Sequence, residues 1–296
     1  MKKPVFTGAA VAIITPMRAD GSVDYEELGR IIDDQIDNGT DAIVICGTTG
    51  ESPTMTDEEH TACIRYAVKK TAGRVPVIAG TGSNDTRYAI WLSRQAQADG
   101  ADALLLVTPY YNKTSQAGLI AHYTAIADAV DLPCILYNVP SRTGCNLTAA
   151  SLKQLAKRPN INAVKEASGN ISQVAEIAAA CGEELNIYSG NDDQIVPLLA
   201  LGGKGVISVL SNVAPRYTHD ICAKWFAGDT AGSLAMQLAA LPLCKALFAD
   251  VNPIPVKWAM NRLGWHAGAC RLPLVDPDEA VQAQLDSALR AFGLLS

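Results

Sequence analysis

The feature that most constrains the fold of this chain is a regular alternation of short apolar runs with helical patterns. The apolar or β-branched runs begin near eight positions, Ala9, Ala42, Val75, Ala103, Cys134, Asn162, Asn186 and Gly205. Helical patterns follow them, for example at residues 25–38, 57–72 and 86–98. Strands that alternate with helices in this way form parallel sheets with crossover helices. Eight such units are the number that closes a barrel, so the sequence predicts an α/β fold, the (β/α)8 TIM barrel.

An open doubly wound sheet is the alternative fold for the same alternation. Sheets of that kind that bind dinucleotides carry a GxGxxG motif after the first strand. No such motif follows the first strand here, and "GTGSND" at residues 80–85 lacks the third glycine. The barrel is therefore the preferred prediction.

The chain after residue 214 has a different pattern. It contains helical segments at residues 215–227, 230–248, 255–263 and 276–292, with no convincing strand between them. We therefore predict that residues 1–214 form the main part of the barrel. Residues 215–296 would supply the last barrel helix and a C-terminal helical extension.

Composition and charge exclude several kinds of partner. Hydrophobic residues make up 49% of the 296 residues, which is enough for a large core, and the net charge of −6 argues against nucleic acid and anionic membranes. No apolar run approaches the roughly 18 residues of a membrane span. Two lysines precede the first apolar stretch, as in a signal peptide, but Thr7, Gly8 and Pro16 interrupt it. A first buried strand is the better interpretation.

The cysteines and histidines give no sign of a metal site. The eight cysteines include no CxxC pair, and most have apolar neighbours. This pattern is typical of buried thiols in a reducing cytoplasm. The four histidines are not clustered in the sequence. We expect no metal, no cofactor and a cytoplasmic location.

One predicted strand contains a lysine in apolar surroundings. The stretch "INAVKEASGN" at residues 161–170 reads as a short buried strand that ends at Gly169. Successive side chains of a strand point to opposite faces, so Lys165 and Glu166 cannot form a simple salt bridge with each other. We predict that Lys165 points into the barrel and that Glu166 points outward. A lysine near a strand end that extends to the surface is the alternative.

The predicted carboxyl ends of the strands carry a set of residues rich in hydroxyl groups. In a barrel the active site lies at these ends. The set comprises Thr48 and Thr49 after the second strand, Tyr110 and Tyr111 after the fourth, Tyr137 and Arg142 at the fifth, Lys165 on the sixth, Gly190 after the seventh and Ile207 on the eighth. Each of these alone also fits a turn, a packed aromatic pair or a surface charge. Their joint occurrence at matching strand ends predicts an active site.

This set suits covalent chemistry on a carbonyl group. Burial disfavours the ammonium form of Lys165, so its pKa falls from about 10.4, and the neutral amine can form a Schiff base. Tyr137 can move protons, with Thr48 and a tyrosine of the "YY" pair as a relay. Thr49 and nearby backbone N–H groups suit a small carboxylate, and Arg142 offers a rigid fork for a second one.

The motifs "GTTGES", "TPYYN", "YNVPSRTG" and "VKEASGN" resemble those of the dihydrodipicolinate synthase family, within the pyruvate-dependent class I aldolase superfamily. The resemblance extends from about residue 5 to residue 292. It implies that Lys165 forms an imine with pyruvate and that Tyr137 is the general acid/base. It also implies that Thr48 links Tyr137 to Tyr111, with Tyr111 reaching in from a neighbouring subunit.

The same resemblance implies the substrate-binding residues. Thr49 and the backbone of Ile207 would hold pyruvate, Gly190 would be a further binding position, and Arg142 would receive the carboxylate of L-aspartate 4-semialdehyde. The product would be 4-hydroxy-tetrahydrodipicolinate, in the synthesis of lysine and diaminopimelate. Members of the family are typically cytoplasmic homotetramers that use no cofactor.

Other members of the superfamily remain alternatives because they share the lysine and the tyrosine. N-acetylneuraminate lyases usually have serine where Thr48 stands and lack the arginine at position 142. Other relatives cleave keto-deoxy sugar acids or 4-hydroxy-2-oxoglutarate. A non-catalytic regulator on the same fold is a more distant alternative, because Lys165, Tyr137 and Thr48 are intact.

The resemblance also implies a site for feedback inhibition by lysine, and here the sequence departs from the family. Positions that match a lysine site at a subunit interface carry Ser52, His60, Asn84 and Tyr110. A second histidine of some members is replaced by Asp57, and a glutamate that receives an ammonium of lysine is replaced by Tyr88. We expect weak inhibition by lysine or none.

Overall fold

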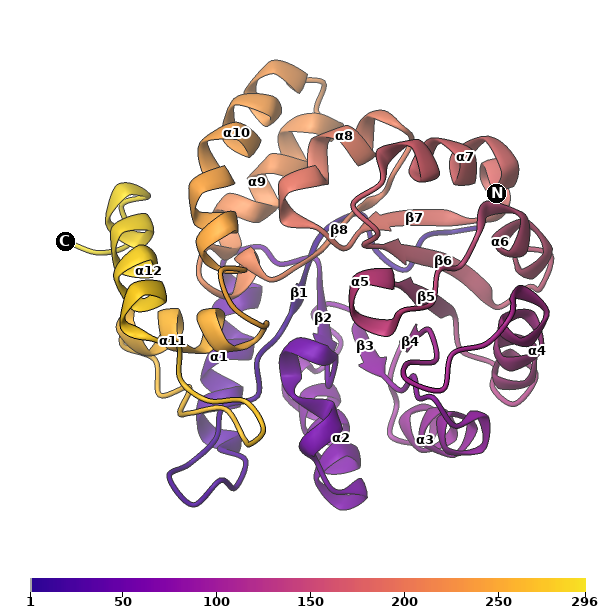
Figure 1. Ribbon diagram of the computed structural model, residues 1–296, viewed down its shortest axis with the longest axis horizontal. Coiled ribbons are helices and arrows are strands. Elements are labelled where there is room, and N and C mark those ends of the chain that lie inside the picture. Colours follow the sequence, from indigo (N-terminus) through magenta and orange to yellow (C-terminus); the bar gives the residue numbers. More distant parts are fainter. Residues whose placement is uncertain (1) are drawn as a thin grey trace.

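Residues 2–296, which the computed structural model describes, contain eight strands, one for each predicted apolar run (Figure 1). They are β1 (Gly8–Ala12), β2 (Ala42–Ile45), β3 (Val77–Gly80), β4 (Ala103–Val107), β5 (Cys134–Asn138), β6 (Ile161–Glu166), β7 (Asn186–Ser189) and β8 (Gly205–Ser208). The strands pair in parallel in chain order, and β8 pairs with β1 to close the barrel. The prediction of a (β/α)8 barrel is confirmed.

The third strand shows the largest difference between a predicted and an observed start. It begins at Val77 rather than at Val75. Pro76 lies between the two and has no N–H group to donate to a neighbouring strand. Its carbonyl does accept a hydrogen bond from the N–H of Ile43, at 2.9 Å.

Most of the barrel helices begin directly after a residue whose side chain caps them. The barrel helices are α1 (Tyr25–Asp37), α2 (Asp57–Thr71), α3 (Thr86–Ala98), α4 (Gln116–Ala127), α6 (Ala149–Leu155), α7 (Ile171–Cys181), α8 (Ile195–Ala200) and α9 (Pro215–Phe226). Thr56 and Glu59 form a capping box at the start of α2, and Asp24, Asp85 and Asn170 cap α1, α3 and α7. Such caps satisfy N–H groups that the first turn of a helix leaves without partners.

Short helical segments that the sequence analysis did not predict follow several strands. They are η1 (Thr48–Gly50), η2 (Ser52–Thr54), α5 (Pro140–Thr143), η3 (Gly182–Glu184), η4 (Asp192–Gln194) and η5 (Leu210–Asn212). All but η3 lie after the carboxyl ends of strands. This is the end of a barrel where active-site residues are found.

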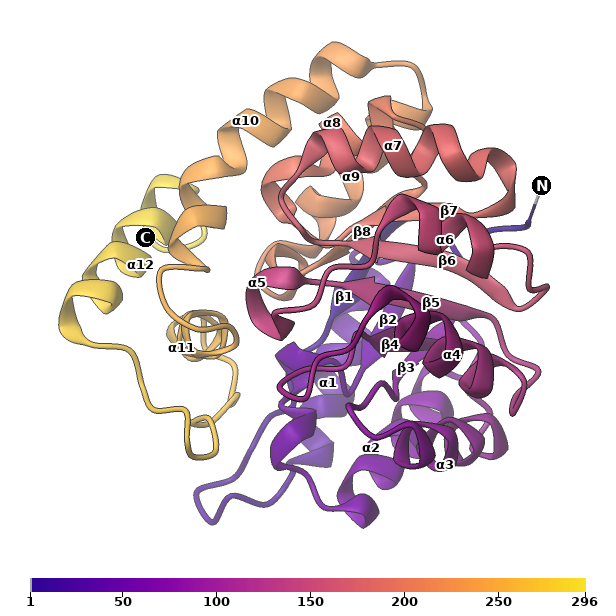
Figure 2. The same cartoon turned by 45° about the vertical axis from the view of Figure 1, so that its right-hand side comes forward.

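The chain beyond β8 is helical, as predicted. α9 packs against β1 and is the last barrel helix, and α10 (Thr230–Ala246) packs on α9. α11 (Ile254–Arg262) and α12 (Glu279–Ala291) lie outside the ring of barrel helices (Figures 1 and 2). The division of the chain at residue 214 into barrel and extension stays a prediction.

Two layers of side chains fill the fold on either side of the strands. Small residues such as Ala10, Ala42 and Ala163 point into the barrel, where Phe6 and Tyr188 stack with ring centroids 4.3 Å apart. The Tyr188 hydroxyl donates a 2.7 Å hydrogen bond to the carbonyl of Phe6. Because Phe6 precedes β1, this pair fills the amino-terminal end of the barrel. A cavity is left at the carboxyl end.

The thiols are placed as the sequence predicted. Within the described residues, all eight cysteines are free, and only Cys270 is not fully buried. None of the helices in this part of the chain is long and apolar enough to cross a membrane.

Candidate active site

Lys165 lies on β6 and points into the barrel. It pairs in register with Tyr137 of β5 and Tyr188 of β7, and only 6% of its surface is exposed. Its Nζ lies 4.2 Å from the centroid of the Tyr137 ring. Burial lowers the pKa of Lys165 to about 8, the charge of Asp192 acts to raise it, and the charge of Arg142 lowers it further. The ammonium form is therefore disfavoured at this position.

Glu166 points to the opposite side of β6, as the strand geometry predicted. It does not reach solvent, however, because it is buried between the strands and α7. Its carboxylate accepts hydrogen bonds from Asn138 Nδ2 at 2.9 Å, from the N–H of Ser168 at 2.7 Å and from Gln173 Nε2 at 3.3 Å. Glu166 thus fixes the end of the strand that carries Lys165.

Gly190 is required to be a glycine for steric reasons. A β-carbon at this position would lie 3.0 Å from Cε of Lys165 and 2.7 Å from Cβ of Ala167. The Gly190 N–H donates a 2.8 Å hydrogen bond to the carbonyl of Glu166, which holds the end of β7 close to β6. A larger residue would push Lys165 out of its position.

A cavity of about 480 Å³ opens above Lys165 at the carboxyl end of the barrel. Six predicted site residues line it, namely Thr48, Thr49, Tyr137, Arg142, Lys165 and Gly190. Burial raises the pKa of the Tyr137 phenol, and the charge of Arg142 acts to lower it. The cavity thus combines a nucleophilic amine, a neutral phenol and a guanidinium group.

Three residues of the predicted strand-end set do not line this cavity, and one of them, Tyr110, lines a neighbouring cavity. The Ile207 side chain is buried inside the barrel beside Ala10, and Val209 lines the cavity on the β8 side instead. Tyr111 is 92% exposed and has a φ of 67°, in the left-handed region that a tyrosine seldom adopts. The single chain does not bring its hydroxyl to Thr48.

Comparison with known proteins identifies the family. The model of the dihydrodipicolinate synthetase family matches residues 5–292. The chain belongs to this family. The 4-hydroxy-tetrahydrodipicolinate synthase of Lachnoclostridium phytofermentans is 59% identical over 294 residues, which cover 98% of this chain and 99% of the relative.

Solved structures of the same family superpose closely. One is the chloride-inhibited dihydrodipicolinate synthase from Acinetobacter baumannii complexed with pyruvate, with 43% identity, a TM-score of 0.95, and coverage of 98% of this chain and 99% of that chain. Another is the synthase from Cyanidioschyzon merolae with lysine bound, with 42% identity, a TM-score of 0.96, and coverage of 99% and 100%.

The cavity above Lys165 also has a wall that was not predicted from the sequence. Residues 248–252, which connect α10 to α11, line the cavity opposite the strand ends. Asn252 Nδ2 donates a 2.9 Å hydrogen bond to Thr49 Oγ1, and Arg142 Nη1 lies 3.4 Å from the carbonyl of Asn252. The C-terminal extension therefore orients two of the predicted substrate-binding residues.

A buried carboxylate near Lys165 was also missed. Asp192 Oδ2 accepts hydrogen bonds from the N–H groups of Val209, at 3.0 Å, and Leu210, at 2.9 Å. Burial raises the pKa of Asp192, while these hydrogen bonds and the charge of Lys165 act to lower it. No role was predicted for the Asp192 carboxylate, because nothing in the local sequence signals that this aspartate is buried.

The extension also holds the loop after β2 through a buried ion pair. Glu51, with a φ of 58°, directly follows η1, and its Oε1 lies 2.8 Å from Nζ of Lys257 on α11. Both side chains are almost completely buried. The N–H of Arg271 donates to Glu51 Oε2 at 2.8 Å. Lys257 and Arg271 therefore fix the loop that carries Thr48 and Thr49.

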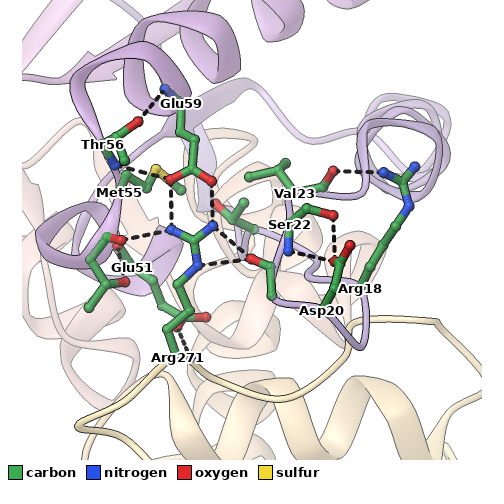
Figure 3. Close-up of polar contacts among 12 residues, drawn as sticks. Arg18, Asp20, Ser22, Val23, Glu51, Met55, Thr56, Glu59 and Arg271 are labelled. Atoms are coloured by element: carbon green, nitrogen blue, oxygen red, sulfur yellow. Dashed lines mark hydrogen bonds and ion pairs between the residues drawn. The ribbon is translucent and has the colours of Figure 1, made fainter.

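The Arg271 side chain extends this contact to the start of α2. Figure 3 shows its guanidinium group facing the carboxylate of Glu59, with which it forms two hydrogen bonds of 2.7 and 2.5 Å. The same group donates to the carbonyls of Thr54 and Gly21. One arginine of the extension thus joins three segments of the barrel.

A second cavity, of about 330 Å³, adjoins the first and shares Thr48 and Arg142 with it. Four of the five residues predicted for lysine binding line it, namely Ser52, His60, Tyr88 and Tyr110, whereas Asn84 does not. Its neighbour Ser83 takes that place, and the Asn84 carbonyl accepts from Asn112 Nδ2 at 2.9 Å.

Two lining residues of the second cavity already have partners within the chain. His60 Nε2 lies 2.8 Å from the carbonyl of Gly80, and burial lowers the pKa of His60. The Tyr88 hydroxyl donates a 2.7 Å hydrogen bond to Asp57 Oδ1, and burial raises the pKa of Tyr88. Tyr88 is therefore neutral near pH 7 and contributes no charge to this cavity.

Proposed function

We propose that this chain condenses pyruvate with L-aspartate 4-semialdehyde to give 4-hydroxy-tetrahydrodipicolinate, in the synthesis of lysine and diaminopimelate. The observation that carries the proposal is a buried lysine of lowered pKa, in contact with Tyr137, at the base of a cavity whose rim carries Arg142. Relatives 53–59% identical to this chain are named 4-hydroxy-tetrahydrodipicolinate synthase.

The lowered pKa makes Lys165 a nucleophile near neutral pH. With a pKa of about 8, roughly a tenth of the amine is neutral at pH 7, against less than about a thousandth for an ordinary lysine. The neutral amine attacks the ketone carbon of pyruvate to form a carbinolamine, which loses water to give the imine. The charge of Arg142 increases the neutral fraction because it lowers the pKa of Lys165.

The remaining steps need proton transfers beside the imine. Loss of a proton from the pyruvate methyl carbon gives an enamine, which attacks the aldehyde of the second substrate. The amino group of that substrate then attacks the imine carbon, closes the ring and releases Lys165. Tyr137 is the group in direct contact with Lys165, and we assign these proton transfers to it.

Thr48 and Tyr111 would complete a proton relay from Tyr137. Thr48 lines the same cavity as Tyr137. Tyr111 is 92% exposed in the single chain and is held in a strained backbone conformation, which suits a side chain that enters a neighbouring subunit. We therefore include a homo-oligomer, a homotetramer in the cytoplasm, in the proposal.

Thr49 would hold pyruvate through its carboxylate, the backbone of Ile207 would be a second contact to pyruvate, and Gly190 would be a further binding position. The Thr49 hydroxyl accepts a hydrogen bond from Asn252 Nδ2, so its own proton is directed elsewhere and can be donated to an anion. The solved structure of the Acinetobacter baumannii relative contains pyruvate, which supports this ligand class.

Arg142→Ala tests the function and the role of the rim together. The wild-type enzyme should consume aspartate semialdehyde with pyruvate and should not cleave N-acetylneuraminate. The variant should raise the KM for aspartate semialdehyde about ten- to a hundred-fold, because a charged hydrogen bond is lost. Borohydride trapping of the pyruvate imine should persist. The pH at which trapping becomes efficient should be higher than in wild type, because Arg142 no longer lowers the pKa of Lys165.

Arg65→Ala is the matched control, because Arg65 forms an exposed ion pair with Asp99 on the outer helices. It should leave both substrates unaffected. A KM for the semialdehyde that is the same in Arg142→Ala and in wild type would remove Arg142 from this role. Cleavage of N-acetylneuraminate by the wild type would instead favour the alternative aldolase function.

We also propose that the second cavity binds free lysine only weakly or not at all. The relative from Cyanidioschyzon merolae has lysine bound in its solved structure. Here the Tyr88 side chain carries no charge, and its hydroxyl is hydrogen-bonded to Asp57. The carboxylate of Glu51 forms an ion pair with Lys257. An ammonium group of lysine would therefore lack one charge-assisted hydrogen bond.

Lysine should inhibit the steady-state rate of the wild-type enzyme only weakly. Tyr88→Glu should make the enzyme about ten- to a hundred-fold more sensitive to inhibition by lysine. The measurement is a lysine titration at saturating substrates. Tyr88→Phe is the control, because it removes the hydrogen bond to Asp57 without adding a charge, and it should stay insensitive. Strong inhibition of the wild type at sub-millimolar lysine would contradict the proposal.

A further inference from the structure

The active-site cavity contains a carboxylate to which no role has been given. Within residues 2–296, Asp250 is the only acidic residue that lines it, whereas Lys165 and Arg142 are cationic. Asp250 belongs to the segment that connects α10 to α11, and it is partly exposed. The C-terminal extension places Asp250 on the cavity wall. No strand end supplies a carboxylate to the described part of this cavity.

The Asp250 carboxylate is oriented by its own backbone. Oδ1 accepts a 2.6 Å hydrogen bond from the N–H of Val251. Oδ2 has no hydrogen-bond partner among the described residues. One oxygen is therefore fixed, and the other remains able to accept a hydrogen bond from a ligand in the cavity.

Asp250 lies on the same stretch of the cavity rim as the guanidinium group of Arg142. Arg142 Nη1 contacts the carbonyl of Asn252, two residues after Asp250. The rim therefore carries both a cation and an anion. An α-amino acid carries its carboxylate and its ammonium on one carbon, so its recognition requires two neighbouring groups of opposite charge.

The charge balance of the cavity leads to the same ligand. An ammonium group that enters beside Arg142 is repelled unless a carboxylate faces it. The other nearby aspartates do not meet this need, because Asp192 and Asp193 line a neighbouring cavity. Asp192 is moreover buried, with Oδ2 engaged by the N–H groups of Val209 and Leu210.

We propose that Asp250 binds the ammonium group of the second substrate and so selects an amino-acid semialdehyde over an aldehyde acid without an amino group. This inference rests on the proposed function, since it assigns the second substrate of that reaction. Arg142 and Asp250 then hold the two charged groups on the α-carbon. The aldehyde is left to point inward to the enamine on Lys165.

The test compares two ligands and several variants. Succinate semialdehyde is aspartate semialdehyde without its amino group, and it serves as a competitive inhibitor against aspartate semialdehyde. Asp250→Asn should raise the KM for aspartate semialdehyde about ten- to a hundred-fold. It should leave the inhibition constant of succinate semialdehyde and the imine trapping with pyruvate unchanged.

Asp193→Asn is the control, because that exposed aspartate lines the neighbouring cavity, and it should change neither constant. Asp250→Glu keeps the charge, so it should retain more affinity than Asp250→Asn, and it also serves if the asparagine variant does not fold. Equal losses for both ligands, or an unchanged KM in Asp250→Asn, would overturn the assignment. A wild-type enzyme that forms the pyruvate imine but does not consume aspartate semialdehyde would instead refute the proposed function itself.

Discussion

Lys165→Ala should abolish both turnover and the borohydride trapping of pyruvate, with a loss of activity larger than that of Arg142→Ala or Asp250→Asn. Without the amine no imine forms, and the enamine that attacks the aldehyde cannot be generated. The measurement is mass spectrometry of the adduct after reduction. The wild-type enzyme should carry one adduct per chain, on the peptide that contains Lys165.

The pH dependence of trapping tests the lowered pKa of Lys165. Below its pKa the group is protonated and cannot attack, so the rate of imine formation should rise with pH and level off above about pH 8. An ordinary lysine would require a pH above about 10. Lys204→Ala is the control, because Lys204 precedes β8 at the opposite end of the barrel, and it should trap pyruvate normally. An adduct on another lysine would refute the assignment of Lys165.

The barrel could be predicted because its signal is local and repeated. Each buried strand is a short apolar run. Several helices start after a short polar residue that can cap them, such as Asp24, Thr56 or Asp85, and glycines such as Gly39, Gly73 and Gly100 follow helix ends. Lys165 could be assigned to the interior from its strand alone, because the alternation of faces separates it from Glu166. The burial of Glu166 was not foreseen, because its partners Asn138 and Gln173 come from different elements.

The wall formed by residues 248–252 could not be predicted from local sequence. Asn252 contacts Thr49 across 203 positions, and Lys257 contacts Glu51 across 206. No periodicity or motif within either segment encodes such a pairing. The tail was therefore read as an addition to the barrel, although it supplies part of the cavity and orients Thr49.

Lys257→Met should destabilise the folded protein strongly. The substitution keeps the length of the side chain but leaves Glu51 buried without its charge partner, and breaking a buried ion pair in this way costs about 3–5 kcal/mol. The measurement is the urea midpoint of unfolding. Activity should fall as well, because Glu51 directly follows the turn that carries Thr48 and Thr49.

Two further variants separate the buried charge from the packing of the side chain. Lys224→Met removes an exposed ion pair with Asp229 and should leave the midpoint nearly unchanged. Glu51→Gln combined with Lys257→Met removes both charges, so it should recover part of the lost stability. The Arg271 N–H can still donate to an amide oxygen at position 51 in that double variant. If Lys257→Met were as stable as the wild type, the ion pair would not be what holds the loop after β2, and the contacts of Arg271 with Glu51 and Thr54 would have to hold it instead.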